Sequence, residues 1–336
     1  MGSPFQGWEI FVGTFPGRCP GLVLVGPLGL HSRVCKQRPS IVSTAQLTPL
    51  LANRDLDRLA RLRINARRRF TNRARGEHLA AKGGTSTEFC DYRDYAPGDD
   101  VRFVDWNIFA RIERPYLKQF HQEEELHVAV LLDASNSMLF EGKFDLARQL
   151  ATAIGVVGLR GSEKVSVTVL GGARPQRMPP STGRASLRKL FGFLERVETG
   201  GEMPIDAGIE MFLRRHTGRG VAVLVSDFLT PGDLQRAFNL LHGAGLEIFA
   251  AQILAPGELA PELAGDLRFV DSETHATLDI SSAADLLALY HEYRDAHTAR
   301  IAELCRQRQG RCLALSAAEP FERVAFDIMR RRGWLI

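Results

Sequence analysis

The chain has 336 residues, of which 45% are hydrophobic and 24% are charged, a composition typical of globular proteins. The formal net charge of +4 is too small to indicate nucleic-acid binding. Five cysteines never occur as Cys-x-x-Cys, which argues against a zinc site or disulfide framework and favours a reduced, cytoplasmic protein. No stretch reaches the roughly 18–20 apolar residues that span a bilayer, so no transmembrane segment is predicted.

Residues 1–45 show neither a helical nor a strand period and are rich in Gly and Pro. We expect them to be disordered or a mis-annotated N-terminal extension. The next region, 46–125, opens with a predicted basic helix, in which nine arginines oppose three acidic residues between Arg54 and Glu77. A solvated face and a surface for acidic protein, nucleic acid or anionic lipid remain alternatives. Nucleic acid is not expected, because no aromatic residues interleave the arginines.

Strand and helix patterns alternate in the region 126–336. Strands are predicted as apolar runs at 126–133, 164–170, 220–227 and 246–254, with a hairpin at 266–280 and a short strand at 311–316. Helices are predicted at 144–159, 184–197, 204–215, 231–245, 283–309 and 320–332. Buried strands that alternate with helices are typical of an α/β fold, a doubly wound, mostly parallel sheet with helices on both faces.

Two of these strands end on carboxylates. The first closes with "LLDASNS", which holds Asp133, Ser135 and Ser137, and the later strand closes with Ser226-Asp227. Because ligands collect at the carboxyl ends of parallel strands, we expect these side chains to meet at one edge. Oxygens at alternate positions suit Mg²⁺ or Mn²⁺, with the carboxylates completing the shell, in part through water. The alternative is that the serines cap the following helix and Asp133 accepts hydrogen bonds from backbone amides.

Residues 88–125, the signature block, combine a Pro-Gly turn with clustered charges. We expect a structural network that pins this segment to the sheet, with Trp106 as a buried anchor. A partner-binding surface is the alternative. Catalysis is not expected, because no His or Cys nucleophile with a plausible base accompanies the acids. The residues singled out are Glu88, Arg93, Gly98, Asp99, Asp100, Arg102, Asp105, Trp106 and Arg111.

The Asp133-x-Ser135-x-Ser137 pattern with a later Asp227 resembles the metal-ion-dependent adhesion site of von Willebrand factor A-type domains. The signature block resembles that of the bacterial family called domain of unknown function 58, which joins such a block to a von Willebrand A-like domain. In the adhesion domains, a partner's carboxylate fills the last metal position. A threonine usually completes the site, but Glu202 stands there in this chain. Glu202 could bind the ion, replace the partner's carboxylate, or hydrogen-bond to the serine loop.

The resemblance implies a non-enzymatic, cytoplasmic interaction adaptor. Its implied partners are a MoxR-type AAA+ ATPase and other von Willebrand A-like proteins. The alternative function is a metal-dependent hydrolase or phosphotransfer enzyme that uses Asp133 and Asp227. Aspartyl phosphotransferases carry a second acid two residues after the first, whereas this chain has Ser135 there. The sequence therefore favours the adaptor.

Overall fold

The computed structural model describes residues 8–9, 46–66, 71–72, 87–123, 126–172, 174–261, 267–271, 277–280 and 283–336. Apart from Trp8–Glu9, the predicted disordered extension lies outside these residues. In the part of the chain that is described, no helix is both long enough and apolar enough to cross a membrane.

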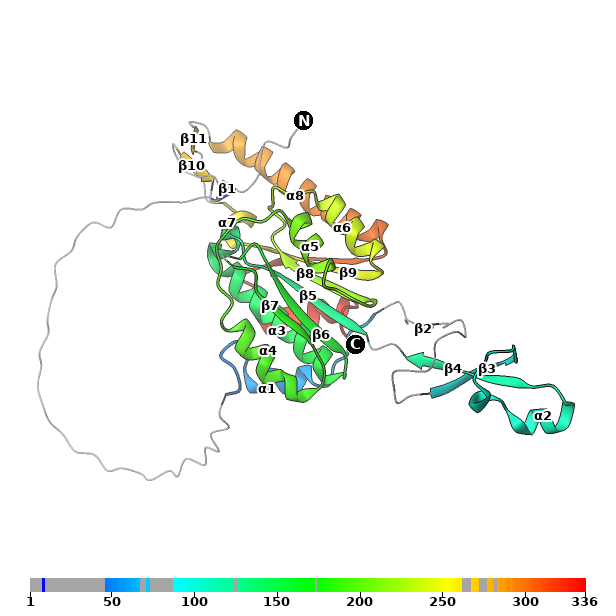
Figure 1. Ribbon diagram of the computed structural model, residues 1–336. Helices are drawn as coiled ribbons and strands as arrows, with labels where there is room; N and C mark the ends of the chain where they lie inside the picture. Colours follow the sequence, from blue (N-terminus) through cyan, green and yellow to red (C-terminus); the bar gives the residue numbers. More distant parts are fainter. Residues whose placement is uncertain are drawn as a thin grey trace, which may run out of the picture.

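A six-stranded sheet forms the centre of the molecule (Figure 1). Its order is β12-β9-β8-β5-β6-β7, and neighbouring strands run parallel except for β7, which is antiparallel to β6. The middle strands are buried on both faces because their sequences are continuous apolar runs. The strands are β5 (His127–Asp133), β6 (Lys164–Leu170), β7 (Arg177–Ser181), β8 (Gly220–Ser226), β9 (Leu246–Leu254) and β12 (Arg311–Ser316).

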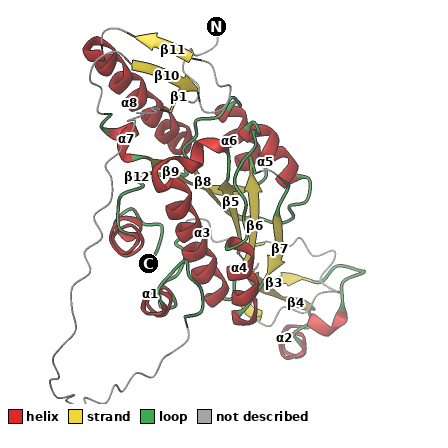
Figure 2. Ribbon diagram, turned by 90° about the vertical axis from the view of Figure 1, so that its left-hand side faces the viewer, coloured by secondary structure: helices red, strands yellow, loops and turns green. Residues whose placement is uncertain are grey.

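Helices cover both faces of this sheet (Figure 2). On β5, Val128, Val130 and Leu132 face one core, whereas Ala129 and Leu131 face the other, as expected from the alternation of a strand. The first core is closed by α1 (Asn53–Leu59), α3 (Lys143–Arg160) and α4 (Leu187–Leu194), together with the C-terminal segment. The second is closed by α5 (Ile205–Leu213), α6 (Leu234–Gly243) and α8 (Ala283–Gln307). The predicted doubly wound α/β fold is confirmed.

Some predicted elements differ from the structure. The basic helix ends at Leu59, and the chain then runs extended so that Ile64 pairs with Leu335. The C-terminal helix is divided into α9 (Phe321–Arg323), a π-helical turn (Val324–Ile328) and α10 (Met329–Arg331). Strand β7 was not predicted, because its sequence RMPPS carries two prolines that lack a backbone donor.

Two small sheets accompany the central one. The first has the order β1-β10-β11, with β1 (Trp8–Glu9), β10 (Leu267–Asp271) and β11 (Thr277–Ile280), and it contains the predicted hairpin. The second contains the signature block, in the order β2-β4-β3, with β2 (Thr71–Asn72), β3 (Thr87–Asp94) and β4 (Tyr116–Glu123). Helix α2 (Trp106–Ile112) connects β3 to β4, and this unit projects away from the central sheet in Figure 1.

Candidate functional site

The adjacent strands β5 and β8 bring two of the predicted site loops together at their carboxyl ends. Leu132 pairs with Val225, so the next residues of the two strands, Asp133 and Ser226, lie side by side. The Ser226 hydroxyl donates to Asp133 Oδ2 over 2.5 Å. Asp227 follows directly, and all three side chains are less than a tenth exposed. The sheet thus joins Asp133 and Asp227 at one edge, as predicted.

The serine loop closes over this edge as a 3₁₀ segment, Asn136–Gly142. The Ser135 backbone N–H donates to Asp133 Oδ1 over 2.9 Å, and the Ser135 and Ser137 hydroxyls lie 3.0 Å apart. The predicted backbone bond to Asp133 is therefore present, but neither serine side chain caps a helix. Both serines are largely removed from solvent, since Ser137 is 1% exposed and Ser135 is 9% exposed.

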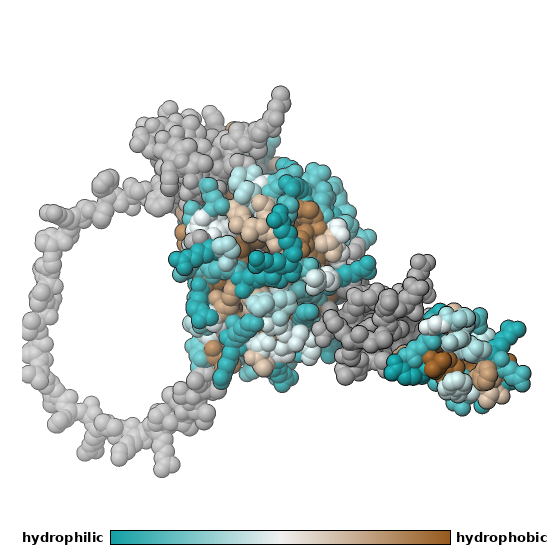
Figure 3. Space-filling view, viewed as in Figure 1, coloured by the Kyte–Doolittle hydropathy of each residue, from teal (hydrophilic) through white to brown (hydrophobic). Residues whose placement is uncertain are grey.

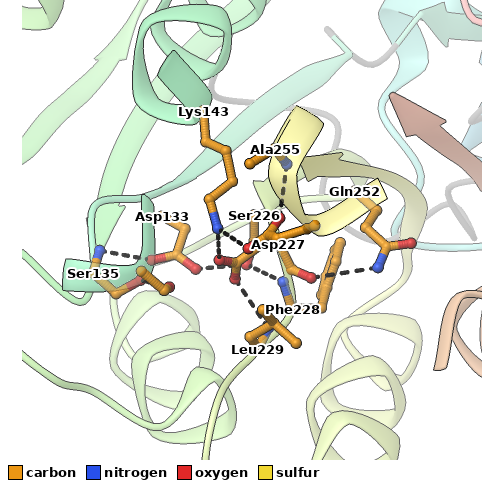
Figure 4. A network of polar contacts seen from close by, with 11 residues as sticks. Asp133, Ser135, Lys143, Ser226, Asp227, Phe228, Leu229, Gln252 and Ala255 are labelled. Atoms are coloured by element: carbon orange, nitrogen blue, oxygen red, sulfur yellow. Dashed lines mark hydrogen bonds and ion pairs between the residues drawn. The ribbon is translucent and has the colours of Figure 1, made fainter. Parts of the chain in front are cut away.

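A buried lysine enters the same edge, and sequence reasoning missed it. Lys143, the first residue of α3, is wholly buried. Its Nζ donates to Asp227 Oδ2 over 2.9 Å and to Glu258 Oε1 over 2.7 Å (Figure 4). Two carboxylates offset the cost of removing the ammonium group from water. A signal was available: Lys143 shares a helical stripe with the buried Ala147 and Ile154, a position where an unpaired charge is not tolerated.

Glu258 comes from the short helix α7 (Pro256–Leu259), which follows β9. Its Oε2 accepts from the backbone N–H of Ala255 over 2.7 Å, so both carboxylate oxygens have donors. The helix is held from two further sides. Glu141 accepts from the Gly257 N–H over 2.7 Å, and the Tyr290 hydroxyl of α8 donates to the Glu258 carbonyl over 2.8 Å. Glu258 is therefore fixed opposite Lys143.

Burial and charge shift the protonation equilibria of this cluster. Burial, helped by the nearby Asp227 carboxylate, raises the pKa of Asp133 to about 6, against the hydrogen bonds from Ser226 and Ser135. Burial also raises the pKa of Glu258, although Lys143 opposes this shift. For Lys143, burial acts to lower the pKa, but Asp227 and Glu258 outweigh it and raise the pKa above its usual value. The lysine is thus charged at neutral pH.

Glu202 lies on the loop between α4 and α5. The backbone of this loop reaches the site, whereas the Glu202 side chain has no polar contact with it among the described residues. The Gly200 N–H donates to the Ala134 carbonyl over 2.9 Å, beside the serine loop. The Glu202 side chain is exposed and forms no hydrogen bond or ion pair with another described residue. The described contacts therefore do not show it bonded to the serine loop.

The space beside the carboxylates is small. The cavity next to Asp133 and Ser135 has a volume of about 10 Å³ and is closed by Leu170, Met203, Ile205, Leu229, Thr230 and Pro231. This is roughly the space that one water occupies. A wider cleft of about 580 Å³ lies outside the loop, between Leu139 and Thr199, and Leu139 is 59% exposed. The wider cleft and the small space beside Asp133 are lined by different residues.

The arrangement of donors around these oxygens does not fit a resident divalent ion. Asp227 Oδ1 accepts from the Leu229 N–H over 3.0 Å, while Oδ2 faces the Lys143 ammonium. Both Asp133 oxygens have donors, and the two serine hydroxyls bond to each other. Among the described residues, no group of three or more His, Cys, Asp or Glu side chains is placed to hold a metal. The Mg²⁺ or Mn²⁺ site stays a prediction.

The charged residues of the signature block bind mainly to one another. Asp105 caps α2 by accepting from the Asn107 and Ile108 N–H groups over 2.9 and 3.2 Å, and it pairs with Lys118 over 3.1 Å. Arg93 pairs with Asp99 over 2.7 Å, and Arg102 with Asp100 over 2.6 Å. Gly98 has φ of +105° in the turn, a conformation that favours glycine.

These contacts stay within residues 92–118, so they brace the small sheet itself. Among the described residues, they do not join the block to the central sheet, and the predicted pinning is wrong in that respect. Arg111 is exposed on α2, and the backbone of Glu88 belongs to β3, while its side chain lies outside the described part.

The prediction of Trp106 as a buried anchor is also wrong. Trp106 is 60% exposed, and with Phe109 and Ile112 it follows an i, i+3, i+6 spacing on one side of α2. Trp106 and Phe109 meet edge to face, with ring centroids 5.9 Å apart. Val101, in the 3₁₀ turn before α2, is 54% exposed, and Figure 3 shows brown apolar residues on this projecting unit. We call Val101, Trp106, Phe109 and Ile112 the α2 face.

Comparisons with known proteins relate this chain to one family. The family described as protein of unknown function DUF58 matches residues 91–300. The chain is 28% identical over 286 residues to the uncharacterized proteins Rv1480 of Mycobacterium tuberculosis and Mb1516 of Mycobacterium bovis, covering 82% of this chain and 90% of each relative. The solved structure of BatB from Bacteroides thetaiotaomicron is 16% identical, with a TM-score of 0.37, covering 61% of this chain and 98% of that one.

Proposed function

Since the chain belongs to the family described as protein of unknown function DUF58, we propose that it is a non-enzymatic, cytoplasmic interaction adaptor. In this proposal the α2 face binds a MoxR-type AAA+ ATPase, and the edge around the serine loop forms a second contact, with the ATPase or with another von Willebrand A-like protein. The choice of partner comes from the family resemblance. The docking surface comes from the structure.

The α2 face is the observation that carries the proposal. Five of the eleven large apolar side chains that are exposed in the described part of the chain lie between Tyr92 and Ile112. A helix of a globular protein normally turns such a stripe toward a core. Exposed aromatic residues that cluster on a projecting unit are typical of a protein-binding surface, where Trp and Tyr contribute much of the binding energy.

The carboxylate edge supports the non-enzymatic part of the proposal. The Ser135 and Ser137 hydroxyls bond to each other, and among the described residues neither has a hydrogen bond to a histidine that could act as a base; an unactivated hydroxyl is a weak nucleophile. Ser226 does contact a carboxylate, but it is 1% exposed. These contacts favour a structural role for the edge over hydrolysis.

Binding between the purified chain and the MoxR-type ATPase of the same genome tests the proposal. Calorimetry should show binding to the wild type and a loss of roughly 2 kcal/mol or more for Trp106→Ala, the scale of an interface hot spot. Met211→Ala is the matched control, because Met211 is 47% exposed on α5 of the central domain. Equal affinities for the wild type, Trp106→Ala and Phe109→Ala would exclude the α2 face as the docking surface.

A further inference from the structure

We propose that Lys143 is the built-in cation of the carboxylate edge: its ammonium group balances Asp227 and Glu258 in the place where a divalent ion would otherwise be needed. The negative charges of Asp227 and Glu258 are then balanced without a metal ion. This inference concerns the ion chemistry of the edge and does not depend on which protein binds to the α2 face.

The first support is the position of the ammonium group. Lys143 is wholly buried, and its Nζ lies within 2.9 Å of Asp227 Oδ2 and 2.7 Å of Glu258 Oε1. The three residues come from the start of α3, the end of β8 and the helix α7, which are distant in sequence. Figure 4 shows the lysine side chain extending straight to the Asp227 carboxylate. Burial of this kind is seen when a charge is paired.

The second support is that every carboxylate oxygen at the edge already has a donor. Asp227 accepts from Lys143 and the Leu229 N–H, Glu258 from Lys143 and the Ala255 N–H, and Asp133 from the Ser135 N–H and the Ser226 hydroxyl. A divalent ion would have to use the remaining lone pairs of these oxygens. It would also lie close to the Lys143 charge, in surroundings that screen repulsion weakly.

The third support is that the surrounding structure holds the lysine's second carboxylate in place. Glu141, just before α3, binds the Gly257 N–H, and Arg294 of α8 donates to the Leu259 carbonyl over 2.5 Å. With the Tyr290 bond to the Glu258 carbonyl, these contacts fix both ends of α7. Because Glu258 is held in this way, its carboxylate favours a cation at one position. The Lys143 ammonium group lies at that position.

Titration with Mn²⁺, followed by the loss of the free-ion electron paramagnetic resonance signal, tests the inference. The wild type should bind Mn²⁺ no more strongly than Asp133→Ala does. Lys143→Met should bind at least about tenfold more strongly than the wild type, or roughly 1.4 kcal/mol, because the Asp227 and Glu258 carboxylates then lack their cation. Mg²⁺ should also raise the melting temperature of Lys143→Met while leaving that of the wild type unchanged.

Two further variants keep the test decisive. Lys143→Met/Glu258→Gln removes one charge of each sign, so it folds more readily than the single variant and should also gain Mn²⁺ binding. Lys189→Met removes an exposed lysine that bonds Ser181 and should leave Mn²⁺ binding unchanged. Saturable binding to the wild type that is lost in Asp133→Ala overturns the inference, whether or not the lysine variants fold. A folded double variant without any gain in affinity overturns it as well.

Discussion

Lys143 and Asp227 form an ion pair that is almost completely excluded from solvent, with side-chain exposures of 0% and 1% and an Nζ–Oδ2 distance of 2.9 Å. The pair joins the first turn of α3 to the loop after β8, across the edge where the predicted metal ligands meet. The pair affects the free energy of unfolding mainly when one partner is removed, because the other charge then stays buried without compensation.

Replacing this lysine should destabilise the fold strongly. We expect Lys143→Met to lower the free energy of unfolding by about 3–5 kcal/mol, the cost of leaving one member of a buried pair alone. Urea denaturation measures the change, and the exposed Lys189→Met should stay within about 0.5 kcal/mol of the wild type. A loss below about 1 kcal/mol for Lys143→Met would mean that the buried pair does not form in solution.

Truncation of two tryptophans should change the free energy of unfolding by very different amounts. Trp106 is 60% exposed on α2, so Trp106→Ala should change the free energy of unfolding by no more than about 1 kcal/mol. Trp334 is 1% exposed and packs on Phe249 with ring centroids 4.9 Å apart, so Trp334→Ala should cost about 3–5 kcal/mol. Thermal and chemical melts of the two variants check this. A large loss for Trp106→Ala would show that α2 packs against the rest of the chain.

Acid should destabilise the protein through the opposite end of β5. His127 binds the Ser166 hydroxyl over 2.9 Å and stacks on His216, and burial together with His216 lowers the pKa of His127 to about 4. The unfolded chain takes up this proton near pH 6.5, so the contribution of His127 to the free energy of unfolding falls as the pH drops from about 6.5 to about 4, by up to roughly 3 kcal/mol, while the raised pKa of Asp133 acts in the opposite sense below about pH 6.

Denaturation at several pH values measures this loss. His127→Gln should reduce the loss of stability between about pH 6.5 and 4, since one of the rings with a lowered pKa is gone while His216 remains. The matched control is His242→Gln, on the half-buried end of α6, which should retain the profile of the wild type. If both variants lose stability with acid as the wild type does, another group is responsible.

The protein should show no enzymatic turnover. Purified protein should show no phosphatase, ATPase or esterase activity above that of Asp133→Ala, because the serine hydroxyls of the loop bond to each other and the space beside Asp133 is about 10 Å³. Steady-state assays with and without Mg²⁺ are the measurement. Metal-dependent turnover that disappears in Asp133→Ala would favour the hydrolase alternative.

The central sheet could be predicted because its strands carry a strong local signal. β6 and β9 have the predicted bounds, and the runs that form β5 and β8 differ only at their ends. The edge was predictable for the same reason, since parallel strands place their carboxyl ends together. Asp133 and Asp227 meet there.

The partners of these carboxylates could not be found by spacing. Glu258 lies 115 positions after Lys143, so no motif connects them, and only the fold brings α7 to the start of α3. The exposure of the Trp106 side chain could not be predicted from the sequence either. A large aromatic residue in a charged segment is normally buried, and the sequence does not reveal that α2 rests on a small projecting sheet instead of the central one.

The outer edge of β7 is poorly suited to pair with a strand of another copy of the chain. Pro179 and Pro180 lie in adjacent positions of this strand, and neither has an N–H to offer to an incoming strand. Edge strands are common starting points for aggregation, in which the sheets of separate molecules pair edge to edge. Growth of a continuous sheet from this edge is therefore disfavoured. The exposed aromatic residues of the α2 face lie elsewhere, on the projecting unit.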